Sequence, residues 1–293
     1  MKKCLICGHK AKVERGSQIG DFFYETCLSC GGATLGPREM AIKQSRRVYN
    51  AEYFNWGRPK GLKKIIYSLY LHKDYPDWIE EERHGLKGRI LDIGAGVPTF
   101  LENMGSRGWE VFAQELSRPQ GVKIAKSIGA DKVFIGDFEK INLPKKYFDV
   151  VTFWHVLEHV KFPPKTIQKA AKLLKPGGQI FVEVPNFNSL SLKIMKSNYS
   201  LLSIPAHLFY YNSKSLRRLF TNCGFKTEAV YYPLKYNLTF SGSLLRALQN
   251  KIGNAVVFQI IFYMSAFISL PISILSSFLG MTEVIRVVAK KRN

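Results

Sequence analysis

The sequence predicts an α/β fold in which a seven-stranded, mainly parallel sheet carries helices on both faces. From residue 89 onward, short runs of β-branched and aromatic residues alternate with longer amphipathic stretches, and this alternation is typical of a parallel sheet covered by helices. Two features lie outside this pattern. Two cysteine pairs near the N-terminus predict a small metal-binding module, and a long apolar run before the last strand predicts a helical insertion.

The composition excludes disorder and leaves several partners open. Of 293 residues, 46% are hydrophobic and 13% aromatic, which is enough to bury a core. The formal net charge of +21 suits nucleic acid, an anionic membrane surface or a phosphorylated substrate. Residues 1–12 lack the apolar segment and cleavage site of a secretory signal, so we expect a cytoplasmic protein with reduced thiols.

The first element is a cysteine module that we place at residues 1–36. Two residues separate the cysteines of each pair, and 19 residues lie between the pairs, as in a four-thiolate zinc ribbon. The ligands would be Cys4, Cys7, Cys27 and Cys30. Four thiolates leave no open position on the metal, so we expect a structural zinc ion. Cys223 stands alone and is expected to be a buried hydrophobic residue.

After a linker and helical cap at residues 37–87, we place the α/β domain at residues 88–293. Its expected strands are 89–95, 111–116, 132–137, 148–154, 179–185, 226–232 and 283–289. Helices should fill most of the gaps between them. The segment 173–178 predicts the end of a helix, because a basic residue, a proline and two glycines lead into the next strand.

A ligand loop is predicted where the first strand ends. Gly94 and Gly96 lie at this turn, where glycine lets a ligand approach the backbone at the carboxyl edge of the sheet. About 20 residues later, Glu115 ends the second strand, where a carboxylate can accept both hydroxyls of a ribose. These positions predict a nucleoside-bearing cofactor. The loop lacks the Lys-Ser/Thr pair of a phosphate-binding P-loop.

Several blocks together resemble the class I S-adenosylmethionine-dependent methyltransferases, whose sheet is Rossmann-like, over roughly residues 88–290. The blocks are Leu-Asp-Ile-Gly-Ala-Gly at 91–96, Gly-Asp-Phe at 136–138, the segment 148–160 with its Leu-Glu-His-Val, and Leu-Lys-Pro-Gly-Gly-Gln-Ile at 174–180. Leu-Glu-His-Val and Ala-His-Leu-Phe-Tyr at 206–210 are similar to ubiquinone-biosynthesis O-methyltransferases and their uncharacterised relatives.

The resemblance implies a set of cofactor-binding residues: Gly94 and Gly96 against the methionine part of S-adenosylmethionine, Asp92 organising the loop, Glu115 on the ribose, and Asp137 with the Phe138 backbone on the adenine. Asp92 and Asp137 can instead be turn or cap carboxylates. The family commonly has a third glycine where this chain has Pro98. Proline is tolerated in the first turn of a helix. This departure nevertheless leaves open the alternative that the domain is a degenerate, non-catalytic relative of these enzymes.

Three histidines lie where the resemblance places the substrate: His155, His159 and His207. We expect His155 at the carboxyl end of the fourth strand to be the general base. His159 is more simply explained as a core or helix-end residue, and His207 fits a substrate pocket or loop packing equally well. On a helix, His155, Glu158 and His159 would share one face and could hold a divalent cation. Related enzymes, however, usually have an acid at the position of His155.

The apolar insertion, placed at 241–282, includes 27 uncharged residues at 255–281. A single membrane crossing would separate the strands on either side of it, which belong to one sheet. Pro271 divides the run, so we expect an in-plane or shallow re-entrant helical hairpin. Basic residues that could meet anionic head groups flank it: Arg246, Lys251, Arg286, Lys290, Lys291 and Arg292. The alternative is a buried lid or a dimer interface.

These features favour a methyltransferase associated peripherally or monotopically with the inner face of the membrane. Its acceptor would be small or lipid-linked and methylated at oxygen, and the ribbon would help to select it. An RNA methyltransferase is the second hypothesis, because the chain is basic and has a zinc module. A non-catalytic membrane adaptor is the third. The sequence specifies neither the acceptor nor the oligomeric state.

Overall fold

The computed structural model describes residues 1–48, 74–234, 243–244, 247–248 and 255–292. The chain forms two compact units, each assembled from separate stretches of sequence. The first unit comprises Met1–Val48, Val184–Leu216 and Val230–Arg286; the second comprises Tyr49–Glu183, Arg217–Ala229 and Val287–Asn293. The domain boundaries predicted after residues 36 and 87 divide the chain into consecutive segments, whereas each of these units combines separate segments that pack together. The predicted boundaries therefore stay predictions.

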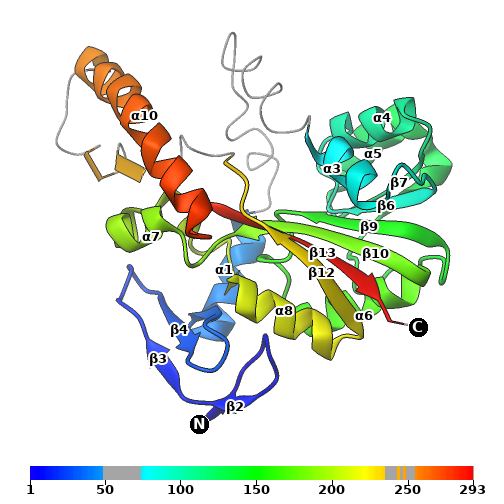
Figure 1. Cartoon of the computed structure of the whole chain (residues 1–293). Helices are drawn as coiled ribbons and strands as arrows, with labels where there is room; N and C mark the ends of the chain where they lie inside the picture. The colour runs from blue at the N-terminus through cyan, green and yellow to red at the C-terminus, as the bar shows by residue number, and fades with distance from the viewer. Residues whose placement is uncertain (49–73, 235–242, 245–246, 249–254, 293) are drawn as a thin grey trace. The chain divides into compact units, whose positions relative to one another are not determined.

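The second unit is built on a seven-stranded sheet in the order β12-β13-β10-β9-β6-β7-β8 (Figure 1). Neighbouring strands from β10 to β8 pair in parallel. The strands are β6 (Arg89–Ile93), β7 (Glu110–Glu115), β8 (Val133–Ile135), β9 (Phe148–Trp154), β10 (Leu174–Pro185), β12 (Phe225–Tyr231) and β13 (Val284–Lys291). All seven predicted strands are present.

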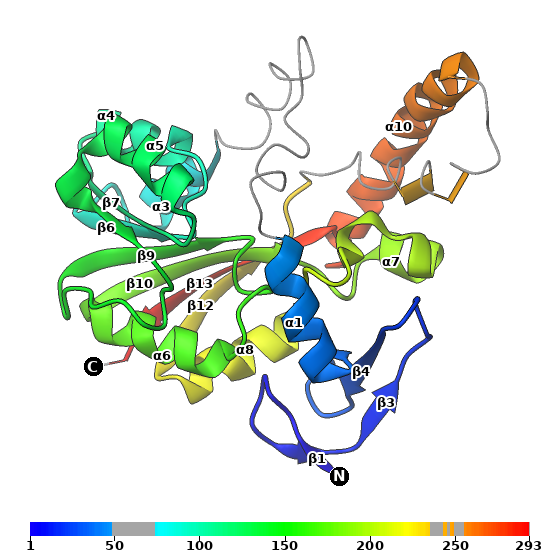
Figure 2. The ribbon, with the colours of Figure 1, turned by 180° about the vertical axis from the view of Figure 1, so that it is seen from behind.

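Helices cover both faces of this sheet (Figures 1 and 2). On one face lie α3 (Asp74–Glu82), α4 (Thr99–Ser106) and α5 (Arg118–Ile128), and on the other lie α6 (Pro163–Leu173) and α8 (Ser213–Asn222). A short 3₁₀ turn at Ala130–Lys132 precedes β8. Helix α6 ends at Leu173, inside the segment 173–178 where the sequence predicts a helix end, and β10 follows directly. The pairing of β10 with β9 shifts register between Leu174 and Gln179. The α/β fold class is therefore confirmed.

The core of the second unit explains why its central strands are apolar. Ile90, Val150 and Phe181 on neighbouring strands are fully buried, and Trp78 and Phe100 pack against them from the helices. A strand that is covered on both faces has no side facing solvent, so nearly all residues in its sequence are apolar. Burying each such side chain contributes about 1.5–3 kcal/mol. The core thus fixes the carboxyl ends of β6, β7, β9 and β10, from which the loops of the site emerge.

The first unit contains the cysteine module and a four-stranded antiparallel sheet in the order β11-β5-β4-β3. Its strands are β3 (Val13–Arg15), β4 (Phe23–Cys27), β5 (Ala33–Gly36) and β11 (Phe209–Tyr210), and β1 (Lys2–Lys3) pairs with β2 (Lys10–Ala11). Helix α1 (Arg38–Val48) follows β5 (Figure 2). The fourth strand, β11, comes from a segment about 170 residues after β5 and was not predicted.

The apolar insertion forms one helix, α10 (Ala255–Phe278), with Pro271 inside it. The predicted division into a hairpin at Pro271 is therefore wrong, because a proline removes a single backbone hydrogen bond and need not end a strongly apolar helix. The first unit also holds α7 (Leu190–Met195) and two 3₁₀ turns, Lys196–Asn198 and Ser200–Leu202. Arg246 and Lys251 lie outside the described residues. Among the helices described, none is long and apolar enough to cross a membrane.

Candidate functional site

The loop after β6 is shaped by two glycines. Gly94 and Gly96 have φ angles of 67° and 58°, a region that glycine adopts without strain. A Cβ on Gly94 would lie 2.8 Å from the Val156 side chain, whereas a Cβ on Gly96 would meet nothing closer than a carbonyl oxygen at 3.8 Å. Gly94 therefore permits close packing, and the space beside Gly96 leaves the loop open to a ligand.

Glu115, at the end of β7, lies directly against this loop. Its Oε2 accepts the backbone N–H of Gly96 at 2.8 Å, and its Oε1 accepts that of Ser117 at 2.7 Å. The side chain is buried, and this burial raises the pKa of the carboxyl despite the two donors. Each carboxylate oxygen can accept a further hydrogen bond. The position fits the predicted contact with a ribose, which remains a prediction.

Gln114, which sequence reasoning missed, ties two loops together. Its Oε1 accepts the N–H of Gly94 at 3.2 Å, and its Nε2 donates to the carbonyl oxygen of Gly136 at 2.6 Å. The side chain is buried. A polar residue next to Glu115 in a buried parallel strand is the signal that could have identified it, because such a group needs partners. Gln114 thus fixes the glycine loop relative to the turn after β8.

Asp92 is buried within β6 and accepts a hydrogen bond from Thr152 Oγ1, on the neighbouring strand β9, at 2.6 Å. Desolvation raises its pKa to about 7, although the Thr152 hydroxyl acts in the opposite direction. The carboxyl therefore lies beneath the glycine loop and links the two central strands. This position is consistent with the predicted organising role.

The turn after β8 contains Asp137 and Phe138. Asp137 Oδ1 accepts the backbone N–H of Glu139 at 3.0 Å, which is the contact expected of a turn carboxylate. Phe138 is buried and meets Phe153 edge-on, with ring centroids 6.1 Å apart. Lys169 donates to the carbonyl oxygen of Phe138. The turn is thus held in place, and its contact with adenine stays a prediction.

His155 follows β9 and has a φ of 54°, which is uncommon for a residue other than glycine. Its Nε2 lies 3.0 Å from Glu183 Oε1, and its Nδ1 lies 3.3 Å from Glu158 Oε1. The imidazole is 31% exposed, while the two carboxylates are buried. Desolvation lowers the pKa of His155, but the two glutamates together outweigh it and raise the pKa to about 10.

Tyr75 on α3 was also missed by sequence reasoning. Its hydroxyl donates to the same oxygen, Glu183 Oε1, that faces His155. Its ring stacks on Trp154 with centroids 4.1 Å apart and an interplanar angle of 10°. No local motif marks it, since the segment before β6 was expected only to be a linker and helical cap. Tyr75, Glu183 and His155 thus form one hydrogen-bonded group at the carboxyl edge of the sheet.

The segment after His155 is a turn at residues 157–159 rather than the predicted helix. The backbone N–H of His159 bonds to the carbonyl oxygen of Val156 at 3.0 Å, and α6 begins only at Pro163, where prolines suit a first helical turn. The helical-face argument for a divalent cation is therefore wrong. Among the described residues, His155 belongs to no cluster of three potential metal ligands. His159 is half-buried, and His207 is buried in the first unit; their predicted roles remain predictions.

The four paired cysteines converge in the first unit. The sulfurs of Cys4, Cys7, Cys27 and Cys30 all lie within 4.8 Å of one another, and the side chains are buried. Cys4 and Cys30 have their sulfurs 3.8 Å apart, which is about the separation in a tetrahedral zinc site with bonds of about 2.3 Å. A hydrogen bond from Cys30 lowers the pKa of the Cys4 thiol to about 5. The donor set fits a structural zinc ion, whereas Cys223 lies apart.

Comparison with known proteins identifies a family for more than half of the chain. A family model described as a methyltransferase domain matches residues 67–230. This stretch contains the glycine loop, Glu115, His155 and Glu183.

Several relatives carry the same name. The ubiquinone biosynthesis O-methyltransferase of Dechloromonas aromatica is 34% identical over 139 residues, which cover 44% of this chain and 59% of that protein. Its counterpart from Idiomarina loihiensis is 34% identical over 183 residues, which cover 58% and 70%. The Erwinia tasmaniensis protein is covered to 60%, so the chain spans about 60% of the length of the first of these curated relatives.

Solved structures share the fold at low identity. The 1,6-didemethyltoxoflavin-N1-methyltransferase of Burkholderia thailandensis, with bound 1,6-didemethyltoxoflavin and S-adenosylhomocysteine, has a TM-score of 0.54 at 13% identity, covering 96% of this chain and all of that one. A SAM-dependent methyltransferase of Thermotoga maritima has a TM-score of 0.52 at 16% identity, with coverage of 85% and 98%.

The raised pKa of His155 predicts a pH-dependent contribution to stability. A histidine whose folded pKa exceeds its ordinary value of about 6.5 stabilises the fold fully below that value, and this contribution is lost as the pH approaches 10. We expect the stability advantage of wild type over His155→Gln to shrink across this window, as measured by urea unfolding at a series of pH values. In a Glu183→Gln background the window should end at lower pH. An advantage that stays constant from pH 6 to 10 would contradict the raised pKa.

Proposed function

Since the chain belongs to the class I S-adenosylmethionine-dependent methyltransferases, we propose that it methylates an oxygen of a small or lipid-linked acceptor at a membrane surface. The observation that carries the proposal is the group formed by His155 and Glu183, which lies at the same edge of the sheet as the glycine loop and Glu115. Val156, next to His155, packs over Gly94. The ubiquinone-biosynthesis relatives support oxygen as the acceptor atom.

The residues around the glycine loop fit the cofactor. Glu115 offers carboxylate lone pairs beside the open space at Gly96, Gln114 fixes Gly94, and Asp92 supports the strand below. When bound, S-adenosylmethionine supplies an electrophilic methyl group on a sulfonium. The contribution of the chain is to hold the reacting groups in line, which can account for much of the rate acceleration of such a displacement.

A hydroxyl acceptor also needs a base, and we assign this role to His155. Nε2 faces Glu183 at the shorter distance, so the neutral imidazole keeps its hydrogen there and offers Nδ1 as the proton acceptor. The 3.3 Å contact of Nδ1 with Glu158 must open when the acceptor enters. The O–H bond of the acceptor then breaks, its proton moves to Nδ1, and the electron pair stays on the oxygen. The bound cofactor would supply the methyl group to this oxygen, and its sulfur would keep the electron pair of the broken S–CH3 bond. The imidazolium that results is stabilised by Glu183 at Nε2.

We also assign a structural zinc ion to the cysteine cluster. Its four buried sulfurs match the spacing that tetrahedral thiolate coordination requires. β11 adds the fourth strand next to the module, so the metal would stabilise the fold of the first unit.

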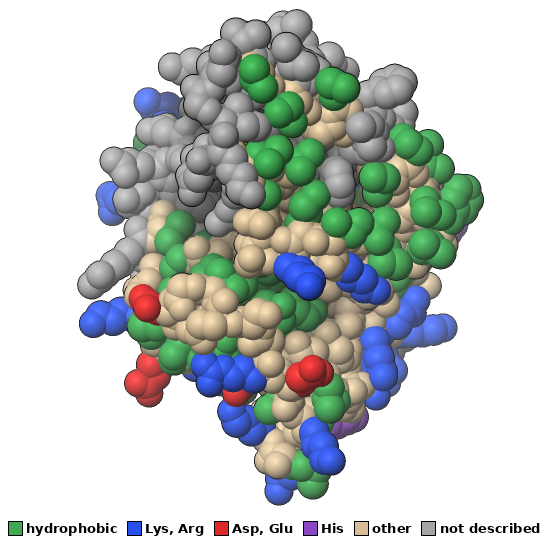
Figure 3. Space-filling view, turned by 90° about the vertical axis from the view of Figure 1, so that its left-hand side faces the viewer, with side chains coloured by type: hydrophobic (Ala, Val, Ile, Leu, Met, Phe, Trp, Pro, Cys, Tyr) green, Lys and Arg blue, Asp and Glu red, His purple; other side chains and the backbone are tan. Residues whose placement is uncertain are grey.

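Helix α10 supports a location at a membrane because, among its described side chains, polar ones are buried and large apolar ones are exposed. Ser265 and Ser276 are buried, at 4% and 5% exposure, whereas Phe278 is 86% exposed. Val257, Met264, Pro271 and Phe278 recur every seven residues and are exposed, so they form one stripe along the helix. Figure 3 shows hydrophobic side chains gathered on the surface that faces the viewer. Large apolar side chains outward and serines inward suit a contact with lipid.

The charge of the neighbouring segments suits an anionic lipid surface. Lys193 and Lys196 at α7 are exposed, with Ile194 exposed between them. Residues 184–216 and 230–286 include a single acid, Glu283, which accepts hydrogen bonds from Ser191 and Tyr199. The expectation that Arg286 meets head groups is wrong, because its side chain is buried in β13. The basic contact would therefore come from Lys193 of α7 and from Lys196 directly after it.

The cofactor assignment predicts that Glu115→Gln weakens S-adenosylmethionine binding by about 10- to 100-fold, because a charged acceptor is lost from two or more hydrogen bonds. Calorimetric titration of the purified protein measures this. Glu110→Gln, at the exposed start of the same strand, is the control and should bind like wild type. Equal affinity in Glu115→Gln, or no binding by wild type, would remove the assignment.

The base assignment predicts that kcat/KM rises about tenfold per pH unit above neutrality and levels near pH 10, where His155 becomes neutral. His155→Asn should lose about 10²- to 10⁴-fold in rate and flatten the profile. The measurement is transfer of a labelled methyl group to acceptors in a lipid extract and in a total RNA fraction. Label that enters RNA alone would overturn the proposed acceptor class.

The zinc assignment predicts about one zinc ion per purified chain by elemental mass spectrometry. Cys30→Ser should lose the metal and lower the melting temperature, whereas Cys223→Ser, the matched control, should keep it. A metal-free protein that melts like the metal-loaded one would rule out a structural role.

The membrane assignment predicts that the protein floats with vesicles containing phosphatidylglycerol. Met264→Glu with Phe278→Glu should weaken this binding by at least about 10-fold, since burying one such side chain is worth about 1.5–3 kcal/mol. Val122→Glu, an exposed apolar position on α5, is the control. If the wild-type protein does not float with the vesicles, or if the variants change only the oligomeric state, the partner of α10 would be a second copy of the chain.

A further inference from the structure

A buried carboxylate is shared by two groups at the carboxyl edge of the sheet. Glu183 in β10 has no solvent-exposed surface, and its Oε1 faces both His155 Nε2 and the hydroxyl of Tyr75. Tyr75 is also buried, with 2% exposure. Because a buried carboxylate is strongly destabilising without donors, the two contacts together fix the position of Glu183.

We propose that Tyr75 is a positioning residue of the methyl transfer: it holds Glu183 so that His155 keeps its hydrogen on Nε2 and directs Nδ1 toward the acceptor. This inference rests on the proposed function, in which Nδ1 takes the proton of the acceptor hydroxyl. Tyr75 touches neither acceptor nor cofactor in this role. It acts through the carboxylate alone.

The tautomer follows from the donors and acceptors present. Tyrosine donates one O–H, and neutral imidazole carries one N–H on either nitrogen. When Tyr75 fixes Glu183 Oε1 beside Nε2, the imidazole hydrogen is favoured on Nε2, because the contact with Glu183 is 3.0 Å whereas the contact of Nδ1 with Glu158 is the longer one, at 3.3 Å. In the described part of the chain, the ionisable groups that face His155 include Glu158 from its own turn and Glu183 from β10, and Tyr75 of α3 contacts the same Glu183 oxygen.

Aromatic packing holds Tyr75 at this point. Its ring stacks on Trp154 at 4.1 Å and meets Phe100 edge-on, with centroids 6.2 Å apart. One turn further along α3, Trp78 meets Phe181 of the core edge-on at 5.0 Å. Helix α3 is therefore fixed against the sheet by two of its aromatic residues, and its rotation is restricted.

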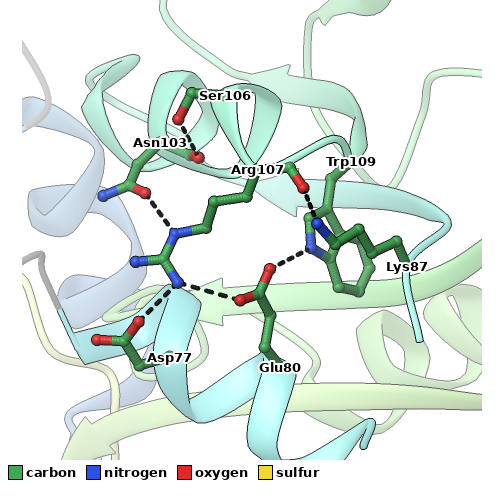
Figure 4. A network of polar contacts seen from close by, with 7 residues as sticks. All are labelled: Asp77, Glu80, Lys87, Asn103, Ser106, Arg107 and Trp109. Atoms are coloured by element: carbon green, nitrogen blue, oxygen red, sulfur yellow. Dashed lines mark hydrogen bonds and ion pairs between the residues drawn. The ribbon is translucent and has the colours of Figure 1, made fainter. Parts of the chain in front are cut away.

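A polar clamp fixes the same helix from its other side (Figure 4). Arg107, after α4, pairs with Asp77 at 2.6 Å and with Glu80 at 3.1 Å, both on α3. The guanidinium Nε also donates to Asn103 at 2.8 Å, and Trp109 donates to Glu80 at 3.1 Å. Exposed ion pairs are individually weak, but the contacts with Asp77, Glu80 and Asn103 converge on one guanidinium. We infer that this clamp holds α3 in the position that brings the Tyr75 hydroxyl to Glu183.

The first test is Tyr75→Phe, which removes the hydroxyl and keeps the ring. We expect kcat to fall by about 10- to 100-fold, as for other groups that orient a catalytic imidazole, with unchanged affinity for S-adenosylmethionine. The alkaline limb of the pH profile should shift. Tyr147→Phe, whose ring packs beside Arg89 and Phe148, is the matched control and should behave like wild type. Equal rates and pH profiles for wild type and Tyr75→Phe would overturn the inference.

The second test addresses the clamp. Arg107→Gln should lower kcat in the same direction as Tyr75→Phe, and the double variant should lose less than the product of the two effects, because both act through one hydrogen bond. Arg89→Gln, which breaks the ion pair with Glu110 at 2.6 Å, is the control. Multiplicative effects of Arg107→Gln and Tyr75→Phe would overturn the role of the clamp.

A third measurement separates this inference from the proposed function. Nitrogen NMR of His155 in the cofactor-free protein reports the tautomer without turnover. We expect a hydrogen on Nε2 in wild type at high pH and a mixture of tautomers in Tyr75→Phe. That change without methyl transfer to any acceptor would support the positioning by Tyr75 and overturn the function. An identical tautomer in both proteins would overturn the positioning even if the enzyme is active.

Discussion

Glu183 lies at the carboxyl end of β10 with no solvent around its carboxylate, and a charge in such a place is stable only when donors surround it. The donors come from different parts of the second unit. His155 follows the neighbouring strand β9, and Tyr75 comes from a helix on one face of the sheet. The carboxylate therefore couples strand, turn and helix. It also sets the charge of the imidazole, since two glutamates face the two nitrogens of a single ring.

The buried carboxylates near the glycine loop also need hydrogen-bond donors, and here the donors are uncharged groups. Glu115 is buried and receives backbone N–H groups from the glycine loop and from Ser117, while Gln114 joins that loop to the turn after β8. Asp92 is satisfied by Thr152 across the strands. Each polar side chain at this edge is thus held by a partner on a different segment. Such support places the loop within reach of a ligand before any ligand binds.

The first unit poses a different physical problem, because it presents apolar surface where most proteins present charge. The described side chains of α10 place serines inward and large apolar residues outward. Lys193 of α7 and Lys196 directly after it are exposed in the same unit. The cysteine cluster in the same unit needs no catalytic function. Thiolate coordination would replace part of the apolar core that so small a module cannot build.

Local sequence was sufficient for the seven strands, the cysteine cluster and the glycine loop with Glu115, because each depends on side-chain periodicity or on spacing within a short segment. Tertiary structure decided the rest. The turn after His155 replaced an expected helix, α10 continued through Pro271, and β11 joined a sheet whose other strands lie about 170 residues earlier in the sequence. Tyr75, Gln114 and Arg107 acquire their roles only through partners distant in the chain. No local pattern encodes such partners, since burial and hydrogen bonding are satisfied by whatever segment the fold brings into contact.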